Sequence, residues 1–368
     1  MEEELRRVDA RCVGITTTVP IEILYAAEVT PVDLNNAFIT DPEPLALVEQ
    51  AERRGFPRTM CSWVKGIYTA ARRRGVGALV AVVQGDCSNT HALMEILESE
   101  GVRVVDFAYP YRREERLLEA QLARLAERFG TSLAAAERQK QRFDAIRAVV
   151  HEIDRLTWQT GQVAGAENFT WCVNCSDFLG EPERFGADAR RFLEEAKARP
   201  TGSAAILAAG PVGSAGFSPS GSGIRPEGLT PNEGVRIGLL GVPPICSDLF
   251  ERLAALGAAV VFNEMPRQFA MPGPSATLLE QYARYTYPYD IFFRLDDVEQ
   301  ECRRREVRGL IHYVQSFCYR QIQDRLIRER LPWPILTLEC DRPGPLDGAS
   351  RTRLEAFVEM LRAGKANP

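Results

Sequence analysis

Two short apolar runs, each followed by a cysteine, dominate the pattern of hydrophobic and polar positions. Residues 77–83 are too few for an ordinary helix and too uniformly apolar for a half-exposed strand, so they predict a strand buried on both faces. Residues 309–314 have the same character, and both runs lead into the pattern Val-Gln-x-x-Cys, which ends at Cys87 and at Cys318. Because ligands bind beyond the carboxyl ends of strands in open α/β sheets, the two copies predict two equivalent positions for chemistry.

Each apolar run belongs to a series of alternating strands and helices that occurs twice. The predicted strands are 12–16, 29–34, 77–83 and 102–107 in the first half, and 235–241, 259–262, 310–314 and 335–338 in the second. The predicted helices between and after them are 20–27, 62–74, 90–100, one carrying Leu249, Leu253 and Leu256, then 319–330 and 351–361. Residues 35–60 contain the turn signals Asp-Pro and Glu-Pro and are expected to be irregular. The pattern predicts an α/β protein with two doubly wound, Rossmann-like domains whose parallel sheets face a central crevice.

A helical segment separates the two series. Leucines recur at helical spacing in residues 111–160, which predicts a cap or subdomain. Another amphipathic helix is expected over 182–198, and the Gly-, Pro- and Ser-rich residues 210–234 are expected to form a loop or lid. We place an N-terminal α/β domain with the helical segment at residues 1–165, and a C-terminal α/β domain with a terminal helix at residues 166–368.

Composition narrows the function classes. The chain has 368 residues, which suits two domains, and its net charge of −5 gives no indication of nucleic-acid binding. No apolar run approaches the ~20 residues of a membrane span, and the acidic N-terminus does not resemble a signal peptide. We therefore expect a cytoplasmic protein in a reducing environment. Its nine cysteines are then expected to be thiols or metal ligands rather than a disulfide framework.

Three of these cysteines form a candidate metal site. If the halves are related by a pseudo-twofold axis, Cys87 and Cys318 approach each other from opposite walls of the crevice. Cys61 lies at the start of a predicted helix, a position that favours the thiolate. Three thiolates in a water-poor cleft can hold an iron–sulfur cube and leave one iron open for substrate. An ordinary buried thiol is the alternative for any one of them, but the repeated Val-Gln-x-x-Cys pattern favours the metal site.

Several stretches resemble the 2-hydroxyacyl-CoA dehydratase D-component family, which also includes benzoyl-CoA reductase subunits and double-cubane cluster proteins. The resemblance covers nearly the whole chain. It rests on residues 19–27 (Val-Pro-Ile-Glu-Ile-Leu-Tyr-Ala-Ala), Cys61, residues 85–90 (Gly-Asp-Cys-Ser-Asn-Thr), the strand that ends at Cys318, Leu-Glu-Cys-Asp at 338–341, and Arg-Thr-Arg-Leu-Glu-Ala-Phe-Val-Glu at 351–359.

The resemblance implies a 4Fe-4S cluster held by Cys61, Cys87 and Cys318. It also implies an acyl-CoA substrate, a homodimer or a heterodimer with a related subunit, and an ATP-dependent activator protein that donates one electron. The implied activity is that of a lyase, the radical dehydration of a 2-hydroxyacyl-CoA in an anaerobic setting. Two alternatives stay open: an ATP-dependent, low-potential reductase with a double-cubane cluster, and a non-catalytic subunit that relays electrons.

A few further residues have a functional and a structural interpretation. Glu22 follows a predicted helix start and is our candidate catalytic acid or base, although a helix N-terminus also simply favours a carboxylate. Cys172 and Cys175 have metal-ligand spacing and could hold a second cluster with Cys246; the alternative is that they pack at a strand end. Cys12, Cys302 and Cys340 are expected to be structural. The chain lacks a P-loop motif, so ATP hydrolysis is assigned to the partner.

Overall fold

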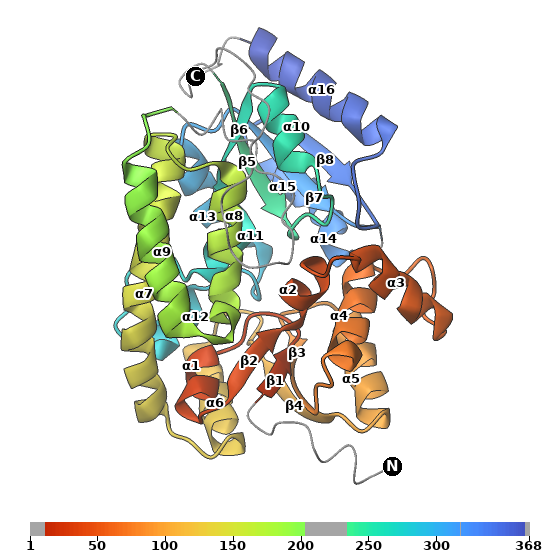
Figure 1. Ribbon diagram of the computed structural model, residues 1–368, viewed down its shortest axis with the longest axis vertical. Helices are drawn as coiled ribbons and strands as arrows, with labels where there is room; N and C mark the ends of the chain where they lie inside the picture. The colour runs from red at the N-terminus through yellow and green to blue at the C-terminus, as the bar shows by residue number, and fades with distance from the viewer. Residues whose placement is uncertain (1–11, 203–233, 317, 365–368) are drawn as a thin grey trace. The chain divides into compact units, whose positions relative to one another are not determined.

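Two four-stranded, all-parallel sheets form the framework of the protein (Figure 1). The computed structural model describes residues 12–202, 234–316 and 318–364. Helices pack around both sheets, which confirms the predicted α/β class and the two Rossmann-like domains. The predicted loop at 210–234 lies outside the described residues, except for Gly234. None of the described helices combines the length and the apolar character that crossing a membrane requires.

The strand order is the same in the two sheets. The first sheet has the order β2-β1-β3-β4 and the second has the order β6-β5-β7-β8. The strands are β1 (Cys12–Ile15), β2 (Thr30–Asp33), β3 (Ala78–Gln84), β4 (Arg103–Ala108), β5 (Val235–Gly241), β6 (Ala258–Asn263), β7 (Gly309–Val314) and β8 (Ile335–Glu339). This identity confirms the repeat that the sequence predicted. The strand order reverses between β1 and β3 in the first sheet and between β5 and β7 in the second. Doubly wound sheets bind ligands at such a point.

The two apolar runs form the central strands β3 and β7. All six residues of β7 are buried, and so are Leu79 to Val82 of β3. Strand β3 pairs with β1 and β4, and β7 pairs with β5 and β8, so each has a hydrogen-bonded neighbour on both sides. A strand in this position is covered by helices on both faces, which explains why its sequence shows no polar alternation.

Residues 35–60 are largely helical, so the prediction of an irregular segment was wrong. Helix α2 (Leu34–Ile39) begins directly after β2, because the Asp33 side chain accepts hydrogen bonds from the first backbone N–H groups of the helix. Helix α3 (Pro44–Arg53) uses Pro44 in its first turn, where the missing N–H has no cost. Pro44, which suggested a turn together with Glu43, therefore starts a helix.

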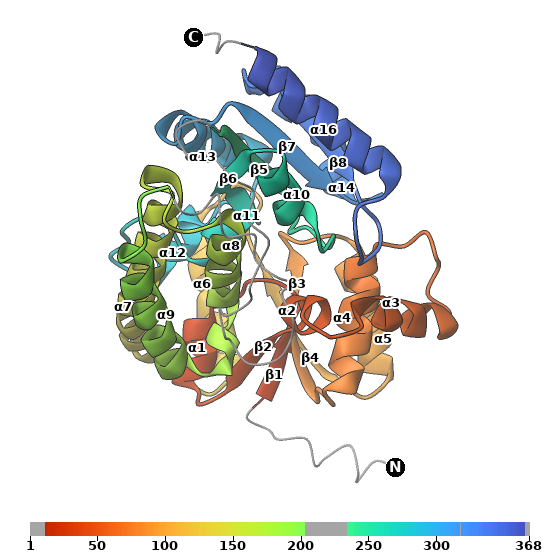
Figure 2. The ribbon, with the colours of Figure 1, turned by 45° about the horizontal axis from the view of Figure 1, so that its top comes forward.

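The other helices before β5 mostly follow the prediction. They are α1 (Ile21–Ala26), α4 (Ser62–Arg73), α5 (Asn89–Ser99), α6 (Glu115–Arg128), α7 (Leu133–Gln159), α8 (Gly165–Val173) and α9 (Pro182–Lys197), with 3-10 turns at Asn174–Ser176 and Phe178–Gly180. Helices α3, α4 and α5 group on one side of the first sheet in both views (Figures 1 and 2). Cys172 lies in α8 and Cys175 in the 3-10 turn that follows it, so the strand end expected as their structural alternative was wrong.

The second half adds helices that the sequence pattern did not indicate. These are α11 (Glu264–Phe269), α12 (Leu278–Arg284) and α13 (Ile291–Arg304); the remaining helices are α10 (Leu249–Ala255), α14 (Tyr319–Ile322), α15 (Asp324–Arg330) and α16 (Gly348–Ala363). Helix α16 contacts β5 and β8 and runs along the second sheet (Figure 2). Its apolar face, with Leu354, Phe357, Val358 and Leu361, is buried as predicted.

The chain forms two compact units, each assembled from three separate segments. The first unit contains residues 1–148, 174–187 and 268–294, and the second contains residues 149–173, 188–267 and 295–368. Each sheet lies in one unit.

Candidate functional site

Cys61 and Cys87 belong to the first unit and pack against the same apolar cluster. Both thiols are half-buried, and the cluster behind them includes Val64, Leu93 and Leu97. Cys61 occupies the N-cap position of α4, but its side chain does not cap the helix with a hydrogen bond. Cys87 lies between the end of β3 and the start of α5. The fold thus places two thiols at helix starts beside one water-poor surface.

Cys87 has a defined set of polar neighbours. Its Sγ lies 3.7 Å from Thr90 Oγ1, and Thr90 Oγ1 donates to Asp86 Oδ2 over 3.0 Å. Burial, and then the negative charge of Asp86, raise the pKa of the Cys87 thiol to about 11. The thiol is therefore protonated at neutral pH, and a metal ion that bound it would displace the proton. Asp86 and Thr90 were not singled out from the sequence, although both lie in the Gly-Asp-Cys-Ser-Asn-Thr stretch.

Cys318 occupies the equivalent position in the second unit. It follows β7, precedes α14 and is half-buried. Its backbone N–H donates to the carbonyl of Gln315 over 3.1 Å. Gln315 is the residue that matches Gln84 in the repeated Val-Gln-x-x-Cys pattern, and it is fully buried. Both copies of the pattern therefore carry a half-buried cysteine just past a central strand.

Within the described residues, no group of three or more His, Cys, Asp or Glu side chains is arranged to hold a metal ion. Two of the three predicted ligands lie in the first unit and one in the second. The chemistry of the donors still fits a thiolate-held cluster. All three are half-buried, and none of the nine cysteines, each of which lies in a described range, forms a disulfide. The three-cysteine ligand set stays a prediction.

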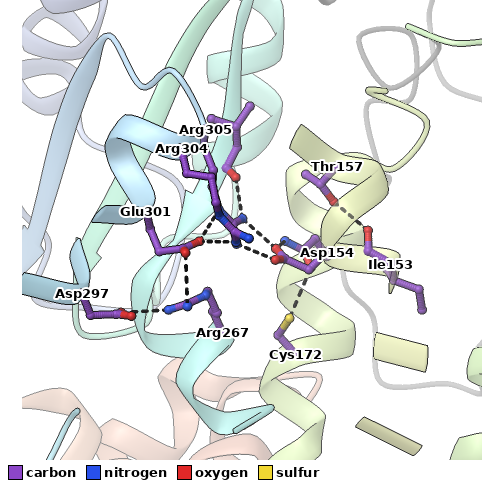
Figure 3. Close-up of polar contacts among 11 residues, drawn as sticks. Ile153, Asp154, Thr157, Cys172, Arg267, Asp297, Glu301, Arg304 and Arg305 are labelled. Carbon is purple, nitrogen blue, oxygen red and sulfur yellow. Dashed lines mark hydrogen bonds and ion pairs between the residues drawn. The ribbon is translucent and has the colours of Figure 1, made fainter. Parts of the chain in front are cut away.

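Cys172 and Cys175 have separate environments. Cys172 Sγ donates to Asn168 Oδ1 over 3.2 Å, and Asn168 in turn donates to Asp154 (Figure 3). Cys175 is fully buried, and burial raises its pKa to about 12. Cys172 belongs to the second unit and Cys175 to the first. These contacts favour structural roles over a second cluster.

The neighbourhood of Cys172 is a buried network of charges in the second unit (Figure 3). Arg305 donates to both carboxylate oxygens of Asp154, over 2.9 and 2.6 Å, and to Glu301 over 2.8 Å. Arg267 is 2.8 Å from Asp297 and 3.5 Å from Glu301. The arginines hold the pKa values of Asp154 and Glu301 below their usual range despite burial. Arg304 also pairs with Glu301 over 2.6 Å, so three arginines face three carboxylates. Such a charge-balanced network is typical of a structural core.

The family model for the 2-hydroxyglutaryl-CoA dehydratase D-component matches residues 16–361 of the chain. The match includes strands β2 to β8 and all three candidate ligands, and it begins directly after β1 ends at Ile15. The chain belongs to the 2-hydroxyglutaryl-CoA dehydratase D-component family. A comparison with curated proteins finds no match. The membership confirms the resemblance stated above and makes the protein a relative of a dehydratase component.

The candidate catalytic residue Glu22 is fully buried in the first unit. Its carboxylate lies 2.7 Å from Arg147 Nη1 and accepts hydrogen bonds from Gln281 Nε2 and Tyr282 Oη, each over 2.8 Å. Burial opposes ionisation, but Arg147 and the hydrogen bonds outweigh it and lower the pKa of Glu22. The carboxylate is thus ionised and fully occupied by protein donors. This geometry favours a structural carboxylate, and a catalytic role stays a prediction.

Asp33 and Asp177 form a buried pair of carboxyl groups that the sequence did not indicate. Asp33 accepts hydrogen bonds from Asn35, and its own backbone N–H donates to Asp177 Oδ2 over 2.8 Å. Burial and the neighbouring Asp33 raise the pKa of Asp177 to about 7. No sequence signal could have found this pair, because the two residues are far apart in the chain and meet only through the fold.

Proposed function

We propose that this protein is the iron–sulfur subunit of a 2-hydroxyacyl-CoA dehydratase-like enzyme. It would remove water from a 2-hydroxyacyl-CoA after an ATP-dependent partner has supplied one electron. The observation that carries the proposal is the family match over residues 16–361, combined with cysteines at equivalent positions after β3 and β7. A dimer with an identical or related subunit and a cytoplasmic location belong to the same proposal.

Cys61, Cys87 and Cys318 would hold a 4Fe-4S cluster. When bound, such a cluster supplies one-electron transfer at low potential and an open coordination position. The apolar cluster behind Cys61 and Cys87 would exclude water from that side. Asp86 and Thr90 would orient the Cys87 thiolate by the contacts described above.

Anaerobic purification with iron and sulfide analysis tests the ligand set. We expect about four irons per chain for a single cluster, and about eight would favour the double-cubane reductase. Cys87→Ala and Cys318→Ala should lose most of the iron and the brown colour. Cys302→Ala is the matched control, because Cys302 is fully buried in α13, and it should keep both. Full iron content in Cys318→Ala would contradict the proposed ligands.

The paramagnetic signal of the reduced protein distinguishes a catalytic subunit from one that only relays electrons. Adding a 2-hydroxyacyl-CoA should change the paramagnetic signal of a catalytic subunit, because the substrate meets the metal site. A signal that responds to the activator protein but to no acyl-CoA would support the relay subunit and overturn the dehydratase proposal.

A further inference from the structure

Two cysteines from distant parts of the chain meet in the second unit. Cys246 lies in the loop between β5 and α10, and Cys340 directly follows β8. The two thiols are close enough for each to be the largest influence on the pKa of the other. The sequence suggests a structural role for Cys340 and a possible second cluster for Cys246, so this pair is a product of the fold alone.

Backbone contacts hold the two cysteine segments together. The Tyr313 hydroxyl, from the central strand β7, donates to the carbonyl of Cys340 over 3.2 Å and accepts from the backbone N–H of Ile245 over 3.1 Å. Cys246 and Gly344 also form a parallel β-bridge. Tyr313 is fully buried. The backbone of both cysteine segments is therefore held in place by contacts with β7 and with each other.

The two thiols are chemically unequal. Cys340 is half-buried, whereas Cys246 is only 8% exposed. The interaction with Cys246 is the main cause of a lowered pKa at Cys340, and the Ser350 side chain lowers it further; burial and the charges of Asp347 and Asp341 oppose the shift. The same contact raises the pKa of Cys246. An accessible, more acidic thiol beside a buried, protonated one is the arrangement of a reactive cysteine with its resolving partner.

We propose that Cys340 and Cys246 are a redox-active dithiol that reduces small disulfides. The Cys340 thiolate attacks one sulfur of the disulfide RSSR, the S–S bond breaks, and RS⁻ leaves and takes the proton of Cys246. The Cys246 sulfur then attacks the mixed disulfide at Cys340 and releases the second RS⁻, which takes a proton from solvent. The two protein thiols are oxidised to one disulfide, and one RSSR is reduced to two RSH.

The new bond would tie together the loops that follow β5 and β8. These strands lie on either side of β7, the strand that leads to Cys318. Oxidation would therefore restrain both neighbours of the segment that carries this cysteine. The proposal itself depends only on the Cys246–Cys340 contact, so it stands or fails separately from the iron–sulfur proposal.

The test uses hydroxyethyl disulfide, a neutral small disulfide, on the anaerobically purified full-length protein. After acid quenching and alkylation, peptide mass spectrometry should find Cys246 linked to Cys340 as the first protein disulfide. Cys246→Ala should stop at a mixed disulfide on Cys340, and Cys340→Ala should leave Cys246 unmodified over the same period. Cys302→Ala is the matched control, because this buried cysteine lies outside the pair, and it should behave as wild type.

Two further measurements keep the test decisive. Alkylation of Cys340 at pH 7 should be at least threefold slower in Cys246→Ala, since the donor to Cys340 is lost. Cys246→Ser keeps the volume and a donor, so it should fold if the alanine variant does not, and it too should stop at the mixed disulfide. The proposal is overturned if wild type forms no Cys246–Cys340 link, if its mixed disulfide persists, or if Cys246 reacts before Cys340.

Discussion

Glu22 could be a catalytic or a structural carboxylate, and its buried ion pair with Arg147 allows the two roles to be distinguished. Glu22 is fully buried, Arg147 is 2% exposed at its side chain, and Gln281 and Tyr282 satisfy the remaining lone pairs of the carboxylate. Removing one partner of such a pair leaves an uncompensated buried charge. The stability of a Glu22 variant, and not only its activity, therefore shows which role the carboxylate has.

We predict that Glu22→Gln lowers the free energy of unfolding by about 3 kcal/mol, because the Arg147 charge loses its buried partner. Urea unfolding followed by circular dichroism measures the effect. Glu49→Gln is the matched control: it removes a carboxylate from an exposed pair with Arg53, which should change stability by less than about 1 kcal/mol. A stable Glu22→Gln protein without activity would instead support the catalytic interpretation.

Asp177 should make the stability of the protein depend on pH. Its pKa is raised from the usual range to about 7 by burial and by Asp33, so the folded state holds a proton that the unfolded state loses. The stabilisation is complete below about pH 4 and is lost as the pH rises through 7. We predict that wild type loses roughly 1–3 kcal/mol more than Asp177→Asn between pH 5 and pH 8.

Urea titrations at a series of pH values measure this difference in slope. Asp296→Asn, which removes an exposed carboxylate, should keep the slope of wild type. Equal slopes for wild type and Asp177→Asn would show that the Asp177 carboxyl titrates alike in the folded and unfolded protein, contrary to the prediction.

At the scale of elements, the turn from β3 to α5 decides where Cys87 lies. Gly85 has a φ of +100°, in the region that favours glycine. An added Cβ would lie 2.6 Å from the Cβ of Pro288 and 3.0 Å from the Cβ of Tyr109. The turn therefore needs glycine for its backbone conformation and for the close packing of its neighbours.

We predict that Gly85→Ala destabilises the protein by at least about 2 kcal/mol, because strain and overlap add at one position. Thermal and urea unfolding measure the change. Gly348→Ala provides the comparison, since the space around this first residue of α16 is open, and it should be neutral or stabilising by up to about 1 kcal/mol. If the two variants were equally stable, the tight turn would not be the constraint described here.

At the scale of the whole molecule, the course of the chain determines what can fold alone. The first unit takes Asp177 from residues 174–187 and Gln281 and Tyr282 from residues 268–294. These residues are the partners of Asp33 and Glu22. A cut made at one point in the sequence therefore removes contacts from the buried centre of the unit.

We predict that a fragment of residues 1–165 does not unfold cooperatively, because Glu22 and Asp33 lose these partners. Urea unfolding and amide hydrogen exchange report the result. Co-expression with residues 166–368 should restore protection of the β1 and β3 amides, because it returns the missing segments. A fragment 1–165 with a sharp unfolding transition of its own would contradict this expectation.

Sequence reasoning performed best where the signal is local. The uniform apolar runs of β3 and β7 and the stripe of leucines in α16 identified elements correctly, because burial acts on neighbouring positions of one element. It failed over residues 35–60, where Glu43-Pro44 was taken as a turn although Pro44 starts a helix. The same residue types serve both purposes, and only the structure that follows distinguishes them.

The primary structure alone established the fold class, the repeated series of strands and helices, and three cysteines at helix starts, because hydrophobic periodicity and helix-start chemistry are written in adjacent residues. Only the tertiary structure showed that Glu22 is held by Arg147, that Asp33 meets Asp177, and that Cys246 meets Cys340. Each of these pairs joins segments far apart in the chain. Their chemistry depends on distance and burial in the folded protein, which no local pattern of residues encodes.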